Sequence, residues 1–134
     1  MPTLSKIEGV GPAYAKKLSS CGVRTTERLL KVAGDRKGRK ALSAESGVSE
    51  KLILEWVNRS DLMRVKGVGE EYSDLLEHAG VDTCKELKNR NAKNLHGAML
   101  EVNAKKKLVR RPPSSSEVER WVAAAKKLRP AVTY

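Results

Sequence analysis

The stretch of sequence that decides the fold is Leu4-Ser5-Lys6-Ile7-Glu8-Gly9-Val10-Gly11-Pro12-Ala13-Tyr14-Ala15-Lys16-Lys17-Leu18. Leu4 and Ile7 stand three residues apart, and Ala15 and Leu18 continue at helical spacing after the Gly-Val-Gly-Pro turn. Glycine has no Cβ, so it turns the chain sharply at low cost and lets a ligand come close to the backbone. The pattern predicts two short helices joined by a tight glycine turn.

The start of the second of these helices is a potential anion site. Gly11 is expected at the N-cap and Pro12 at the first helical position, where a missing N–H costs nothing. The free N–H groups of the first turn and the positive end of the helix dipole favour an anion there, with Lys16 and Lys17 one turn further on. The structural alternative is that the glycines serve only the turn and the apolar residues only the core.

The same pattern returns 58 residues later, in the stretch Leu62-Met63-Arg64-Val65-Lys66-Gly67-Val68-Gly69-Glu70-Glu71-Tyr72-Ser73-Asp74-Leu75-Leu76. Gly22-Val23 is likewise matched by Gly80-Val81, and Trp56-Val57 is matched by Trp121-Val122 at an offset of 65 residues. The chain is therefore interpreted as a duplicated unit with a short insertion in the second copy, around residues 105–113. We expect two lobes, residues 1–60 and 61–134, packed into one body.

The two copies differ in charge at the anion site. The first hairpin carries Lys6, Lys16 and Lys17 against Glu8 alone. In the second, Glu70, Glu71 and Asp74 occupy the positions of Pro12, Ala13 and Lys16. Carboxylates suit a helix N-terminus but repel a phosphate. The first hairpin is thus the candidate binding site, and the second is expected to be structural or to face a protein.

Composition narrows the class of protein. The 134 residues carry a formal charge of +11, which favours nucleic acid, an acidic protein or an anionic membrane surface as partner. No membrane partner is expected, because the basic helices lack the bulky apolar face that binding to a membrane surface needs. Aromatic residues make up only 4% and Phe is absent, which disfavours single-strand binders that stack bases on exposed rings. The two histidines stand apart, so no metal site or other cofactor is expected. No signal peptide or membrane span is recognised, and two cysteines expected to be buried thiols fit a cytoplasmic protein.

Capping signals predict an all-α chain. We expect helices over residues 12–20, from the cap Thr25 to about Val32, over 37–46, and from Ser49 onward. In the second half, Thr83 with Glu86 and Ser114 with Glu117 match the capping-box pattern, and Asn91 opens a long helix. The basic stretches of these helices supply further candidate phosphate contacts, namely Arg36, Lys37, Arg39, Lys40, Lys105, Lys106, Lys107, Arg110 and Arg111.

The chain resembles an uncharacterised bacterial family, catalogued as a domain of unknown function, that is built from two tandem helix-hairpin-helix-like units. The most specific stretches are Ile7 to Pro12, Trp56 to Gly69, Gly80 to Thr83 and Leu108 to Pro112. The resemblance implies an all-helical fold of two five-helix repeats, similar to small SAM-like helical lobes, and no settled activity.

More distantly, Gly9 to Pro12 with Ala15 to Lys17 is similar to the hairpins of DNA repair polymerases, ligases and Holliday-junction proteins. That similarity implies that the backbone N–H groups of Gly9, Gly11 and Tyr14 face a phosphate. The full candidate site is Lys6, Gly9, Val10, Gly11, Tyr14, Lys16 and Lys17.

The leading hypothesis is a non-catalytic protein that binds duplex DNA without regard to sequence. The alternative is a helical scaffold that binds another protein, through the second lobe, and has no nucleic-acid role. The sequence gives no oligomeric state, and no residues combine into a recognisable catalytic set.

Overall fold

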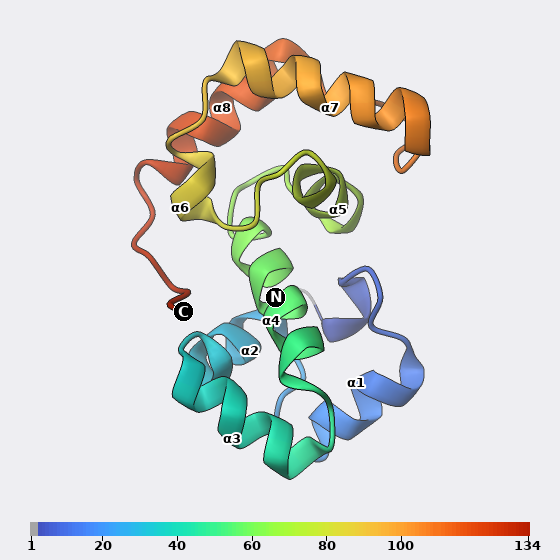
Figure 1. Cartoon of the computed structure of the whole chain (residues 1–134), viewed down its shortest axis with the longest axis vertical. Coiled ribbons are helices and arrows are strands. Elements are labelled where there is room, and N and C mark those ends of the chain that lie inside the picture. Colours follow the sequence, from blue (N-terminus) through green and yellow to red (C-terminus); the bar gives the residue numbers. More distant parts are fainter. Residues whose placement is uncertain (1–2) are drawn as a thin grey trace. The chain divides into compact units, whose positions relative to one another are not determined.

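The computed structural model describes residues 3–134, which form eight α-helices and one 3-10 helix, with no strand among the described residues. One isolated bridge pairs Thr3 with Thr25. The all-α expectation is confirmed. In chain order (Figure 1) the elements are η1 (Leu4–Lys6), α1 (Pro12–Ser19), α2 (Thr26–Ala33), α3 (Arg36–Ser46), α4 (Glu50–Leu62), α5 (Glu70–His78), α6 (Cys84–Leu87), α7 (Ala92–Lys106) and α8 (Ser115–Ala125).

The chain divides into two compact units. The first contains residues up to Asp61 together with the terminal segment Ala131–Tyr134, and the second is Leu62–Pro130. The division therefore follows Asp61, one residue beyond the boundary expected from the repeat. The repeat pattern does not predict that the last four residues belong to the first unit, because nothing in the first copy corresponds to them.

Short polar side chains begin most of the helices. Thr25, Asp35 and Asn91 each accept a hydrogen bond from the backbone N–H three residues later, at the starts of α2, α3 and α7. Such caps satisfy one of the N–H groups that a helix leaves unpaired. The sequence located the starts at Thr25 and Asn91 because the capping interaction is local, whereas the cap at Asp35 was not recognised.

One of the two expected capping boxes is complete. At the start of α8, the Ser114 hydroxyl accepts from the Glu117 N–H, and the Glu117 carboxylate accepts from the Ser114 N–H. At α6 the prediction is wrong in its second half. Thr83 accepts from the Glu86 N–H, but the Glu86 carboxylate accepts from the N–H of Asp82 instead of Thr83.

Each unit has its own apolar core, with a tryptophan in each. Trp56 of α4 and Trp121 of α8 are both buried, as expected, and each packs against a tyrosine with ring centroids 5.1 Å apart. The first core consists of Leu4, Ile7, Val10, Leu18, Val23, Leu29, Ala33, Leu42, Val48, Ile53, Trp56, Val57 and Val132. The second is built around Leu62, Val65, Val68, Leu75, Leu76, Val81, Leu87, Leu95, Met99, Val118, Trp121 and Val122.

The two units share a set of local hydrogen bonds. The N–H of Ile7 donates to Leu4 and that of Val10 to Ile7, just as Val65 donates to Leu62 and Val68 to Val65. After the following helix, Val23 donates to Leu18 as Val81 does to Leu76. The duplicated sequence pattern thus produces the same backbone turns at both places.

The segment before α8 in the second unit is held by side chains. The amide of Asn103 brackets Val109, accepting from its N–H at 2.9 Å and donating to its carbonyl at 3.2 Å. The hydroxyl of Tyr72 donates to the carbonyl of Arg111 at 2.8 Å, and His96 Nε2 lies 2.9 Å from the carbonyl of Pro113.

The two thiols differ in exposure. Cys84 is buried, as expected, whereas Cys21 is only half-buried, so its expected burial is wrong. The pKa of the Cys21 thiol is raised by partial burial and by the neighbouring Glu45 carboxylate.

Candidate nucleic-acid interface

The first hairpin folds around Gly9. η1 ends after Lys6, and two short-range backbone hydrogen bonds carry the chain round to Val10. Gly9 has φ of +91°, a region that residues with a Cβ rarely adopt. Gly11 has φ of −83°, which any residue can adopt, so only Gly9 is required by the backbone of this turn.

The turn rests on two side chains of α4. A Cβ on Gly9 would lie 3.7 Å from Trp56 Nε1 and 3.6 Å from Arg59 Nη1. Arg59 is only 8% exposed, and its guanidinium donates to the carbonyl of Glu8. The turn is therefore held from below by an aromatic ring and a charge-assisted hydrogen bond, while Gly9 and Gly11 themselves are exposed.

No side chain caps the N-terminus of α1. Gly11 is the N-cap residue, Pro12 is the first helical residue, and the two are exposed together with Ala13. A Cβ on Gly11 would have no neighbour within 4 Å. The N–H groups of this first turn and the helix dipole thus face open space, where an anion could approach the backbone.

Three exposed lysines accompany this helix start, as predicted from the sequence. Lys6 ends η1, and Lys16 and Lys17 lie one turn into α1. The Lys17 ammonium lies 5.8 Å from the centre of the Tyr14 ring, within range of a cation–π contact. The Tyr14 ring in turn packs on Trp56, so Lys17 is oriented by the same stack that supports the turn. Val10 is buried, so its side chain belongs to the core and only its backbone can contribute to the site.

The second hairpin has the same turn and a different surface. Gly67 has φ of +93°, and a Cβ there would lie 3.2 Å from Trp121 Nε1. Glu70 and Glu71 form the first turn of α5, where α1 has Pro12 and Ala13. Leu75, at the position of Lys17, is fully buried in the core of the second unit.

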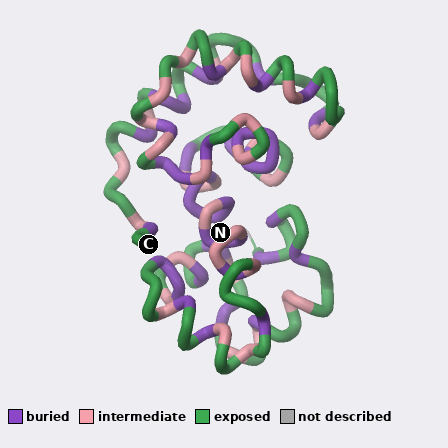
Figure 2. Tube along the Cα trace, viewed as in Figure 1, coloured by how far each residue is buried: buried purple, intermediate pink, exposed green. Residues whose placement is uncertain are grey.

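The starts of α1 and α5 also differ in how far corresponding residues are buried. Asp74, at the position of Lys16, is buried, with the His78 ring nitrogen Nδ1 lying 3.5 Å from its carboxylate. Figure 2 shows the same contrast along the chain, since Leu18 is the one buried residue of α1, whereas α5 has a buried run from Ser73 to Leu76. The second hairpin therefore has no counterpart of Lys16 and Lys17, and its cations, Arg64 and Lys66, both stand before the turn.

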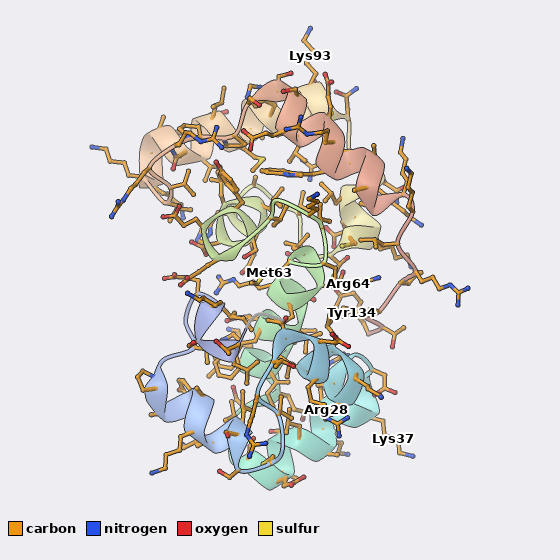
Figure 3. The ribbon with its side chains drawn as sticks, turned by 180° about the vertical axis from the view of Figure 1, so that it is seen from behind. Arg28, Lys37, Met63, Arg64, Lys93 and Tyr134 are labelled. Carbon is orange, nitrogen blue, oxygen red and sulfur yellow. The ribbon has the colours of Figure 1, made fainter. Side chains whose placement is uncertain are left out.

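The basic residues of α3 are of two kinds. Arg36, Lys37 and Lys40 are exposed, and Lys37 extends outward in Figure 3. Arg39 is only 4% exposed, and its guanidinium donates to the carbonyls of three residues, Ala33, Gly34 and Thr133. The prediction of Arg39 as a phosphate contact is therefore wrong, because its donors are used inside the first unit.

The basic residues near the end of α7 are exposed but partly paired. Lys106, Lys107 and Arg110 are exposed, and Lys105 lies 3.5 Å from the Glu101 carboxylate. Arg111 forms two hydrogen bonds to Glu117, at 3.0 and 3.1 Å. That guanidinium, together with the N–H of Ser114, lowers the pKa of Glu117 to about 2. The guanidinium of Arg111 is thus already paired with Glu117 at the start of α8, which makes Arg111 a weaker candidate for a phosphate contact.

Sequence reasoning missed Arg59. It stands three residues after Trp56, on the same face of α4, and holds the hairpin through the Glu8 carbonyl. The spacing of the two residues was visible in the sequence. The second copy, however, has Ala124 at the corresponding place, so comparing the copies hides this role.

Two negative observations concern the described part of the chain. Over residues 3–134, no three His, Cys, Asp or Glu side chains come together as a metal-binding group. Within the same range, none of the helices combines the length and the apolar character needed to cross a membrane.

These features define an all-helical protein with an exposed, uncapped helix start beside three lysines in its first unit. Residues 8–128 match the family described as Domain of unknown function (DUF4332), and the chain belongs to this family. The expected resemblance to an uncharacterised domain family is confirmed. No solved structure matches the chain.

Proposed function

We propose that the protein binds duplex DNA without reading its sequence, and that the first hairpin is its main contact with the phosphate backbone. The observation that carries this proposal is that several features favourable to an anion occur together at the start of α1. The helix start is exposed and uncapped, and it follows a glycine turn that is supported by Trp56 and Arg59. The same hairpin carries three exposed lysines, Lys6, Lys16 and Lys17.

We also infer that the chain consists of two tandem helix-hairpin-helix-like units. The inference is supported by the shared backbone hydrogen bonds, by the positive φ at Gly9 and Gly67, and by the tryptophan beneath each turn. In this view the first unit binds the phosphate, and the second has kept the turn but has Asp74 and Leu75 in place of Lys16 and Lys17.

Gly11 separates a binding role from a structural one. Its φ and its open surroundings permit a side chain, so the fold does not require glycine there. A phosphate bound to the α1 amides would require the absence of a side chain, because a Cβ would stand beside the approaching oxygens. The corresponding Gly69 also has nothing within 4 Å of a Cβ, so it provides a matched control.

The proposal is tested by fluorescence anisotropy of labelled duplexes of unrelated sequence, titrated over a series of salt concentrations. We expect similar affinities for all the sequences and a log–log salt slope of roughly −0.9 for each neutralised phosphate. Gly11→Val is expected to weaken binding about tenfold or more, a loss of ~1.4 kcal/mol, while Gly69→Val leaves it unchanged.

If Gly11→Val and Gly69→Val lose the same amount of DNA affinity, the first hairpin is not the main binding surface. No binding at physiological salt would favour the alternative function, a helical protein-interaction scaffold.

A further inference from the structure

The terminal segment Ala131–Tyr134 is attached to the first unit by its backbone. The N–H of Thr133 donates to the carbonyl of Gly34 at 2.8 Å, and its carbonyl accepts from Arg39 Nη2 at 2.6 Å. Val132, the residue before it, is only 7% exposed. Paired main-chain groups beside one buried side chain are the way in which many proteins hold an extended peptide.

Two residues of the first unit fit this segment closely. Arg39 uses Nη1 to bind the carbonyls of Ala33 and Gly34, at 3.2 and 2.9 Å, and this holds Nη2 toward the segment. A Cβ on Gly34 would lie 2.4 Å from the carbonyl oxygen of Ala131. The same Cβ would lie 2.5 Å from the carbonyl oxygen of Leu30, so the absence of a side chain at Gly34 admits both the end of α2 and the segment.

The surface continues past Thr133 to a cavity of about 310 Å³ lined by Arg36, Arg39, Glu50, Lys51, Leu54 and Tyr134. The hydroxyl of Tyr134, labelled in Figure 3, lies 3.4 Å from Asn58 Oδ1, and its side chain is largely exposed. The last residue therefore lies at the rim, while Val132 and the main chain of Thr133 make the closer contacts.

We propose that this surface, formed by the α2–α3 junction and α4, is a binding site for an extended peptide segment, filled here by the chain's own residues 131–134. Its ligand is a β-branched side chain followed by a residue that offers both its N–H and its carbonyl. The proposal is independent of the DNA-binding function.

The segment is expected to leave the site while the first unit stays folded. Four residues must be ordered, and only one of their side chains is buried, so the contact belongs to the less stable parts of the fold.

The first test is amide hydrogen exchange of Thr133 in the full chain. We expect exchange at least about tenfold slower in the wild-type protein than in Val132→Asp, which removes the buried side chain and changes no residue of the site. Circular dichroism and tryptophan fluorescence check that both proteins are folded. Equal exchange rates in the two folded proteins would show that the segment is not held.

The second test supplies the segment from outside. An acetylated peptide Pro-Ala-Val-Thr-Tyr is titrated into ¹⁵N-labelled full-length Val132→Asp, whose own segment is released, and NMR follows the signals of Gly34 and Arg39. We expect saturable shifts at these two residues. Peptides with Asp at the Val132 position or Pro at the Thr133 position should bind at least about tenfold more weakly.

The Pro peptide lacks the N–H that bonds to Gly34, so it tests the main-chain contact separately from the apolar one. The proposal is overturned if the parent peptide produces no shifts at millimolar concentration, or if all three peptides bind alike. If Val132→Asp fails to fold, hydrogen exchange at the Thr133 N–H of the wild-type protein still tests the proposal. Exchange as fast as in an unprotected amide would show that the segment is not held.

Discussion

The two glycines of the first hairpin should respond differently to alanine. Gly9 has φ of +91°, so Gly9→Ala forces a residue with a Cβ into a conformation that costs about 1–3 kcal/mol. No steric clash is added, because the nearest side-chain atoms would lie at 3.6 and 3.7 Å. The whole cost is therefore backbone strain.

Gly11→Ala meets neither obstacle. Its φ of −83° suits alanine, and the new Cβ has no neighbour within 4 Å. Alanine is a poorer N-cap residue than glycine, but it also reduces the entropy of the unfolded chain by a similar amount. The net change in the free energy of unfolding should stay within about 0.5 kcal/mol.

The assay is equilibrium unfolding in urea followed by tryptophan fluorescence, since Trp56 lies directly beneath the turn. Taking a urea dependence of about 2 kcal/mol per molar, Gly9→Ala should lower the midpoint by roughly 0.5–1.5 M, and Gly11→Ala by less than about 0.3 M. Gly67→Ala should cost more than Gly9→Ala, because its Cβ would lie only 3.2 Å from Trp121 Nε1. Equal losses for Gly9→Ala and Gly11→Ala would refute this account of the turn.

Three further predictions concern stability and packing. Arg39→Met should lower the free energy of unfolding by about 2–4 kcal/mol, because it leaves buried carbonyls unpaired. The control Lys40→Met, on the exposed face, should change it by less than about 0.5 kcal/mol. Both are measured by urea unfolding. Glu117 has a folded pKa of about 2 against an ordinary value of about 4.3, so its stabilisation is complete above about pH 5 and is lost as pH falls toward 2. The difference in melting temperature between wild type and Glu117→Gln should shrink over that interval, and a constant difference would contradict the ion pair. Trp56 and Trp121 should emit at short wavelength and resist quenching by acrylamide, and strong quenching would show that they are exposed.

Local features of this fold could be predicted from the sequence, because their causes are local. The caps at Thr25 and Asn91 act within one helical turn, and so does the box between Ser114 and Glu117. The turn at Gly9 could likewise be anticipated, because its hydrogen bonds join residues three apart. Periodicity placed both tryptophans in the core for the same reason.

One error arises where distant parts of the chain meet, and another is local. Arg39 is one of several basic residues on a short helix, and its guanidinium is taken up by the carbonyls of Ala33 and Gly34 and by that of Thr133, 94 residues later. Pattern reasoning assigned it to the surface because buried arginines are uncommon and their partners cannot be read from neighbouring residues. Glu86 differs more subtly, since its carboxylate reaches the N–H of Asp82, one residue before the expected donor.

The exposure of the candidate lysines could be expected from the sequence, but the contacts that support the turn could not. Lys6, Lys16 and Lys17 are exposed as expected, whereas the contact of Arg59 with Glu8 joins residues 51 apart. The second hairpin is excluded as a phosphate site for two reasons. The acidic residues at the start of α5 can be read from the sequence, whereas the burial of Leu75 is known only from the packed core.

The most direct test of a phosphate site at the first hairpin separates it from the overall positive charge. Lys16→Glu with Lys17→Glu is compared with Lys85→Glu and Lys93→Glu, four exposed lysines whose reversal changes the net charge equally. Duplex binding is measured by anisotropy at several salt concentrations. The account predicts that only the hairpin variant loses most of its affinity, with a salt slope less steep by roughly 1.8. Equal losses in both variants would contradict it and leave the general positive charge as the source of binding.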